Sequence, residues 1–213
     1  MKRSPANPRL ELAAVLASMT LGAVLRLWDA GRLGLSHFDE GIYAAAGSWV
    51  FAPGGRWTLD PSVIPYAPPG LPILIGGAYV ILGPSDVAAI ASVVAAGLLT
   101  IPVAAWVGRR TFGPGAGAAT AALAAIAGPH VAFSRMALTD VPFLLAWLVG
   151  IGLGQRFLER PRLGRAVALG VAVGLAQNLK YNGWLLGAVV ALAAVPGLVL
   201  RRGWSRAEAI ATL

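Results

Sequence analysis

Three short segments hold side chains whose types could support proton transfer or anion binding. They are residues 37–40 (HFDE), 134–140 (SRMALTD) and 180–183 (KYNG). Their candidate site residues are Asp39, Glu40, Arg135, Asp140, Lys180 and Tyr181. Two acids, a cation with an acid, and a cation with a phenol could converge in one cavity. Ionisable residues close to a membrane are costly and usually mark a site or a pathway.

Each of these residues also has a simpler structural role open to it. Asp is a favoured N-cap residue, so Asp39 or Asp140 could cap the helix that begins beside it. Arg135 and Lys180 could instead extend their charged ends to lipid headgroups. These alternatives stay open at the level of sequence.

The sequence lacks the motifs of thiol, metal-dependent, nucleotide-binding and serine-hydrolase chemistry. It has no Cys, and its two His residues, His37 and His130, lack the spacing of metal ligands. We therefore predict no metal site and no cofactor, and dependence on a divalent metal stays open. No nucleotide-binding loop, zinc-protease motif or serine-hydrolase motif occurs.

The composition places these segments in a membrane protein. Of 213 residues, 57% are hydrophobic and 12% are charged, against about 25% charged in soluble domains. Six stretches approach the length of about 20 apolar residues that a span needs. They are Leu10–Trp28, Val87–Val107, Gly113–Val131, Leu138–Phe157, Ala166–Leu179 and Trp184–Leu200. The sequence predicts an all-α, polytopic membrane protein.

The charges predict how the spans are oriented. With the N-terminus in the cytoplasm, the inner segments are 1–9, 108–112, 156–165 and 201–213, and they hold 12 of the 17 Lys and Arg residues. This distribution follows the positive-inside rule. The net charge of +8 therefore indicates membrane topology rather than a nucleic-acid partner. All three candidate segments then lie on the outer, periplasmic face of the plasma membrane.

A long external loop, residues 30–85, should cover that face. Within it, residues 40–51 and 71–82 are predicted as short helices lying on the membrane. Tyr66 begins the segment YAPPG, which reads either as a rigid turn or as part of the site. Residues 1–213 form one predicted domain, and residues 206–213 look like the start of another helix, so we expect a longer protein.

Taken in order, four segments carry a family resemblance: RLWDAGRLGLSHFDEGIYAAAGSWV, YAPPGLPILIGGAYVILG, SRMALTDVPFLLAWL and GLAQNLKYNGWLLG. Together they resemble the N-terminal half of a membrane glycosyltransferase of the GT-C superfamily. The resemblance is closest to family 39, which includes the protein O-mannosyltransferases and the lipid A aminoarabinose transferases. The Asp-Glu pair at 39–40 is its most specific element.

The resemblance implies an inverting transfer from a polyprenyl-phosphate sugar to a hydroxyl group of a lipid, protein or glycan. It implies that Asp39 is the general base and that Glu40 positions it or the acceptor. Arg135 and Lys180 would face the donor phosphate, and Asp140 would hold a cation or the sugar. The same resemblance assigns Tyr66 and Tyr181 to contacts with the phosphate or the sugar.

The sequence differs from the family in two respects, and two alternative functions stay open. Some relatives carry a Lys in the segment that aligns with residues 66–70, where this chain has none, and family members are longer. The alternatives are a polytopic transporter or flippase subunit and an inactive fragment. A transporter would be expected to place its ionisable residues at mid-membrane on broken helices.

Overall fold

The computed structural model describes residues 7–51 and 68–200, and within these ranges the chain forms only helices and their connections. This confirms the predicted all-α class. The α-helices are α1 (Pro8–Leu27), α2 (Phe38–Val50), α3 (Gly70–Leu82), α4 (Asp86–Phe112), α5 (Ala116–Ile126), α6 (Gly128–Ser134), α7 (Asp140–Glu159), α8 (Leu163–Leu179) and α9 (Leu185–Leu200). Two 3₁₀ turns, η1 (Ala30–Arg32) and η2 (Tyr181–Trp184), complete the described elements.

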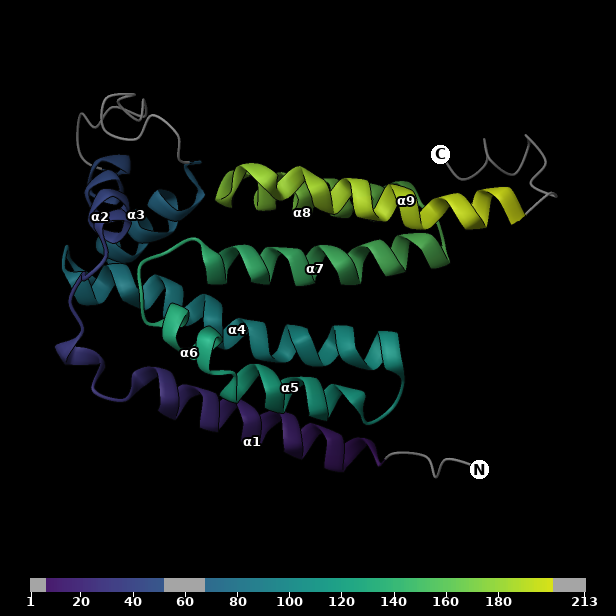
Figure 1. Cartoon of the computed structure of the whole chain (residues 1–213), viewed down its shortest axis with the longest axis horizontal. Helices are drawn as coiled ribbons and strands as arrows, with labels where there is room; N and C mark the ends of the chain where they lie inside the picture. The colour runs from purple at the N-terminus through teal and green to yellow at the C-terminus, as the bar shows by residue number, and fades with distance from the viewer. Residues whose placement is uncertain (1–6, 52–67, 201–213) are drawn as a thin grey trace.

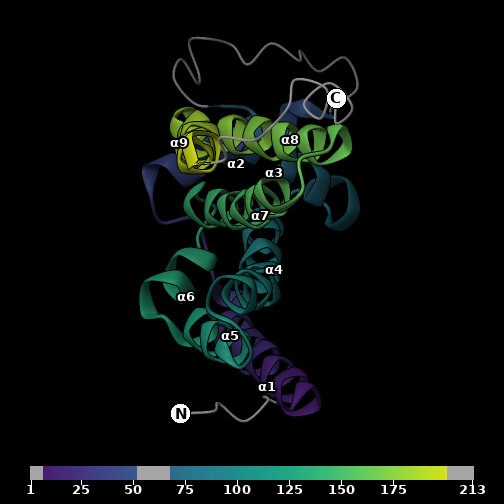
Figure 2. The same cartoon turned by 90° about the vertical axis from the view of Figure 1, so that its right-hand side faces the viewer.

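The long helices are stacked in layers along one common direction (Figure 1). α4 is the central helix and contacts α1, α5 and α7, while α8 and α9 pack on the far side of α7. Figure 2 shows the same layers from the end, with α1 on one side of the stack and α8 and α9 on the other. The short helices α2 and α3 pack together across one end of this stack.

The helices follow the predicted spans in position, but not all have the length of a span. Among the described residues, three segments are long and apolar enough to cross a membrane: Pro8–Arg32, α4 and α7. The bent pair α5–α6 supplies a fourth crossing if the two helices are taken together. The described parts of α8 and α9 are apolar but shorter. A count of six spans is therefore not established.

The third predicted span is not one continuous helix, which corrects the expectation for residues 113–131. The chain leaves the helical region at Ala127, where ψ is 112°, and α6 then runs at 59° to α5. Pro129, at the start of α6, has no N–H to continue the hydrogen bonds of α5. The bend frees the last carbonyl groups of α5 at a depth where little water is available.

Arg26 supplies the missing donors for those carbonyl groups. Its side chain is fully buried, and the guanidinium places each of its five N–H groups against an acceptor. The acceptors are the carbonyl oxygens of Gly22, Ala124 and Ala125, Ser134 Oγ and His130 Nδ1, at 2.6–3.2 Å. Because a guanidinium only donates, His130 Nδ1 must accept here. Arg26 thereby joins α1 to both halves of the broken span.

Small residues let α2 and α3 pack closely, as the two short helices predicted in the external loop. A Cβ added at Gly47 would lie 2.6 Å from Ile75 Cγ2, and one at Gly76 would lie 2.8 Å from the Gly47 carbonyl oxygen. Side chains of α2 and α3 also share a buried apolar cluster with α4 and the start of α7. This cluster fixes α2 and α3 on the end of the stack.

Replacing Arg26 with Met should destabilise the protein by at least about 2 kcal/mol, because each buried acceptor left without a donor costs about 1–3 kcal/mol. The control is Arg32→Gln. Among the described residues the exposed side chain of Arg32 pairs only with Asp29, and its loss should change stability by no more than about 0.5 kcal/mol. Unfolding by SDS in mixed micelles measures both. Equal stability of Arg26→Met and the wild type would show that the broken span does not depend on Arg26.

Candidate functional site

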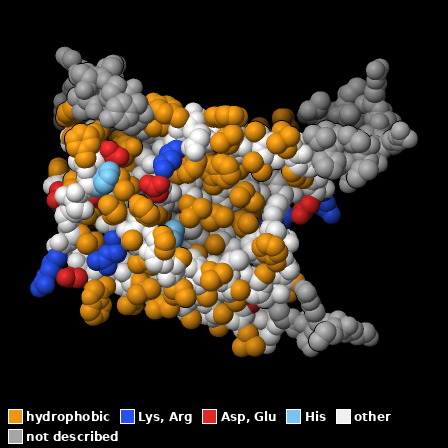
Figure 3. Space-filling view, viewed as in Figure 1, with side chains coloured by type: hydrophobic (Ala, Val, Ile, Leu, Met, Phe, Trp, Pro, Cys, Tyr) orange, Lys and Arg blue, Asp and Glu red, His pale blue; other side chains and the backbone are white. Residues whose placement is uncertain are grey.

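The structure brings the three predicted segments to the same end of the helix stack. Residues 37–40 begin α2, residues 134–140 join α6 to α7, and residues 180–183 follow α8. Figure 3 shows acidic, basic and His side chains gathered at this end, while the middle of the same face is mostly hydrophobic. The three segments therefore lie at one end of the stack, and their convergence in one cavity stays a prediction.

Glu40 connects the first segment to the second. Its side chain is 1% exposed, and Oε1 accepts a hydrogen bond of 2.7 Å from the Ala137 backbone N–H. Oε2 accepts from the backbone N–H groups of Ser36 and His37 at 3.0 and 2.8 Å. Both oxygens are thus occupied by backbone donors. Glu40 holds the start of α2 against the loop at 135–139, which is a positioning role.

Asp39 is the more accessible member of the acidic pair, and it is not the N-cap that sequence alone allowed. The cap is His37, whose Nδ1 accepts from the Asp39 backbone N–H at 3.2 Å, and Glu40 completes a capping box. The Asp39 side chain is 49% exposed. Within the described residues no Lys or Arg forms an ion pair with it. Its carboxylate is therefore available to a ligand.

Asp140 and Lys180 form the charged pair that connects the second segment to the third. Lys180 Nζ lies 2.7 Å from Asp140 Oδ1, and both side chains are partly exposed. The ammonium group also lies 5.9 Å from the centre of the Phe143 ring. Asp140 is the first residue of α7 rather than its cap, which is Thr139, so the capping alternative is wrong for this residue as well.

A tight turn after α8 sets the position of Lys180. η2 folds back on α8 so closely that a Cβ at Gly183 would lie 2.2 Å from the Ala176 carbonyl carbon. Only glycine fits this approach without a shift of the backbone. Tyr181 begins η2 with an exposed side chain, beside Lys180 in the chain.

The structure shows the contacts of Arg135 but does not describe Tyr66. Arg135 Nη1 donates to the Leu25 carbonyl oxygen at 3.0 Å, so this guanidinium ties the 135–139 loop to the last turn of α1. Its other N–H groups have no partner among the described residues. Tyr66 lies outside the described residues, and its assignment stays a prediction.

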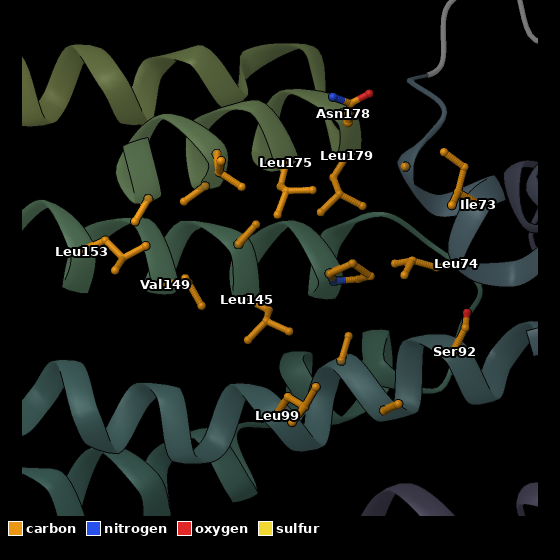
Figure 4. Close-up of a pocket in the computed structure, with 18 residues that line it drawn as sticks. Ile73, Leu74, Ser92, Leu99, Leu145, Val149, Leu153, Leu175, Asn178 and Leu179 are labelled. Atoms are coloured by element: carbon orange, nitrogen blue, oxygen red, sulfur yellow. The ribbon is translucent and has the colours of Figure 1, made fainter. Parts of the chain in front are cut away.

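An apolar groove of about 580 Å³ runs between α3, α4, α7 and α8. Pro142, two positions after Asp140, and Leu179, next to Lys180, both line it. Figure 4 shows Asn178 and Ile73 toward one end and Leu153 toward the other. The labelled lining residues are Ile73, Leu74, Ser92, Leu99, Leu145, Val149, Leu153, Leu175, Asn178 and Leu179. An elongated apolar ligand fits this groove.

Sequence reasoning missed three parts of this arrangement: the groove, the cap at His37 and the buried role of Arg26. The spacing of His37 and Glu40 is that of a capping box, which usually begins with Ser or Thr. The signal for Arg26 was a lone cation inside an apolar span. Among the described residues, no group of three or more His, Asp or Glu side chains could hold a metal ion.

Comparison with known proteins decides the family. The family model for dolichyl-phosphate-mannose-protein mannosyltransferase matches residues 66–211, which is more than half of the chain. The chain belongs to this family. It is a family of the GT-C superfamily, so membership points to a glycosyltransferase carried on membrane helices. No curated protein and no solved structure gives a significant match to the chain.

Within this mannosyltransferase-family chain, the two adjacent acids should respond differently to amidation. Glu40→Gln replaces an acceptor oxygen with an N–H₂ group that faces backbone donors, so we expect a loss of about 1–3 kcal/mol of stability. Asp39→Asn leaves a half-exposed side chain and should change stability by no more than about 0.5 kcal/mol. The same SDS unfolding assay compares them. A stability loss for Asp39→Asn equal to that for Glu40→Gln would contradict these separate roles.

Proposed function

We propose that the protein moves a sugar from a polyprenyl-phosphate donor to an acceptor hydroxyl group, with inversion at the anomeric carbon. The acceptor belongs to a protein, a lipid or a glycan. The family match supports the class of reaction. One structural observation supports the donor class: the chain has an apolar groove, and two of its lining residues, Pro142 and Leu179, are close in sequence to the Asp140–Lys180 pair.

The groove and the cations suit the two halves of such a donor. Each buried CH₂ group of an isoprenoid contributes about 0.8 kcal/mol, so a long chain lying in the groove supplies affinity without polar contacts. We place the phosphate near Lys180. Arg135, on the loop that leads to α7, has N–H groups free to bind the same phosphate.

In the proposed reaction Asp39 takes the proton from the acceptor hydroxyl group as its oxygen attacks the anomeric carbon. The bond from that carbon to the phosphate oxygen breaks, and polyprenyl phosphate leaves with one more negative charge. Lys180 and Arg135 stabilise this charge where little water competes. Glu40 holds the backbone beside Asp39, and Tyr66 and Tyr181 contact the sugar or phosphate.

We further propose that the site faces the outside of the plasma membrane and that the N-terminus is cytoplasmic. The three site segments lie at one end of the stack. At the other end lie the C-terminus of α4, with Arg109 and Arg110, and the end of α7, the following turn and the start of α8, which together hold four more Arg residues. Positively charged ends face the cytoplasm in most membrane proteins.

A transporter is the second candidate, and the bend between α5 and α6 beside a buried cation is the observation that favours it. Arg26, however, has all five of its N–H groups engaged within the protein, so it offers nothing to a transported substrate. The family match also favours a transferase. We therefore rank transport second.

A transfer assay tests the proposal. The protein in membranes is incubated with radiolabelled polyprenyl-phosphate sugars, mannose among them, and with protein, lipid and glycan acceptors. Asp39→Asn should lower kcat by about 10²–10⁴-fold and leave donor binding unchanged. Lys180→Ala should weaken donor binding by roughly tenfold to a hundredfold, since a hydrogen bond to a charged group contributes about 1.5–3 kcal/mol. Absence of transfer from every donor by a well-inserted protein would favour the transporter.

The groove can be tested separately by filling it. Ala146→Trp places a large side chain among the lining residues, and the KM for a long-chain donor should rise roughly tenfold, as if about two buried CH₂ groups were lost. A donor with one short isoprenyl unit should be unaffected. The control is Leu144→Trp, on the same helix at an exposed position outside the groove. If Ala146→Trp leaves the long-chain KM unchanged, the groove does not hold the lipid.

A further inference from the structure

The end of the molecule opposite the candidate site carries an excess of positive charge. Its described cations are Arg9, Arg109, Arg110, Arg156, Arg160, Arg162 and Arg165, and its described acids are Glu11 and Glu159. Both acids already form ion pairs. Glu11 pairs with Arg109 at 3.0 Å and Glu159 pairs with Arg110 at 2.7 Å. The cations between α7 and α8 therefore have no acidic partner among the described residues.

We call residues 156–165, the last turn of α7, the connection and the first turn of α8, the arginine turn. Two of its four Arg side chains have structural roles. Arg165 Nη1 donates to the carbonyl oxygens of Arg156 and Arg160 at 2.7 and 3.1 Å, which satisfies the end of α7. Arg156 lies over the Trp106 ring, 5.8 Å from its centre.

Arg160 and Arg162 have no such role. Both are exposed, and neither side chain has a hydrogen-bond or ion-pair partner among the described residues. They flank Pro161, which limits the backbone freedom of the segment that carries them. Arg162 occupies the N-cap position of α8 without making a side-chain cap bond. Two exposed guanidinium groups, two positions apart in the chain, thus have no partner among the described residues.

Their surroundings indicate which anion they meet. The turn joins two apolar helices, one of them long enough to cross a membrane, so it lies at the level of lipid headgroups. Leu163 and Val167, which follow the turn on α8, expose apolar side chains. A phospholipid can place its acyl chains on such residues and its phosphate on the guanidinium groups, which bind phosphate with two parallel hydrogen bonds.

We propose that the arginine turn is a binding surface for anionic phospholipid headgroups, with Arg160 and Arg162 as its ligand-binding residues. This surface is separate from the proposed donor site and lies at the other end of the helices. Its ligand is a structural lipid of the bilayer and is not consumed. The proposal does not depend on the sugar-transfer reaction.

The test measures lipid preference with purified protein in neutral detergent micelles. Energy transfer from the Trp residues to dansyl-labelled phosphatidylglycerol or phosphatidylcholine gives an apparent affinity for each lipid. The wild type should prefer phosphatidylglycerol by roughly thirtyfold, since each of the two juxtamembrane cations contributes about 1 kcal/mol. Added salt should reduce the preference, because it screens exposed charges.

Three matched variants make the result specific. Arg160→Gln/Arg162→Gln should abolish the preference, whereas Arg160→Lys/Arg162→Lys should keep most of it by keeping the charge. Arg32→Gln removes an exposed cation at the other end and should have no effect. An unchanged preference in the Gln variant, or equal binding of both lipids by the wild type, would overturn the proposal. Competition by soluble glycerol phosphate as strong as by the lipid would also overturn it, since a free phosphate site would then suffice.

Discussion

Backbone polar groups inside a membrane must find partners within the protein, and Arg26 meets this requirement where the structure departs from regular helix. The bend at Ala127 leaves carbonyl groups of α5 without donors, and the buried guanidinium of Arg26, from α1, donates to them. The same guanidinium also donates to Ser134 Oγ and His130 Nδ1. The position of α6 follows from this interaction. The loop after α6 in turn carries Arg135 and leads to Asp140, so the candidate site depends on a contact that is not part of it.

The candidate site is assembled in the same manner, by side chains that bind backbone groups of other segments. Glu40 accepts from Ala137, and Arg135 donates to Leu25. These bonds hold the loop at 135–139 between α1 and α2. We assign the chemistry to Asp39 and Lys180, whose side chains are partly exposed, and to the N–H groups of Arg135 that have no partner among the described residues. The hydrogen bonds thus indicate which charged residues hold the backbone in place and which have atoms available for a reaction.

Sequence predicted most of the fold because hydrophobic length and charge carry most of the information in a membrane protein. Five helices lie where apolar stretches predicted them, and both short external helices were anticipated. The bend at Ala127 was missed because an apolar stretch containing Pro129 reads the same whether a distant cation satisfies its carbonyl groups or not. The backbone contacts of Glu40 and Arg135 were missed for a related reason. Their partners are backbone atoms, which have no signature in the sequence.

The segment 135–139 has a consequence for how sugars of different size could be distinguished. It is fastened at one end by Arg135 and in its middle by Glu40, and it leads to Asp140, which holds Lys180. In the proposed reaction, the sugar ring must fit between the base on α2 and the phosphate at Lys180. The length of this loop would therefore set the distance between the base and the phosphate. Insertion or deletion of a residue within it offers a route to altered sugar selectivity that leaves every reacting side chain unchanged.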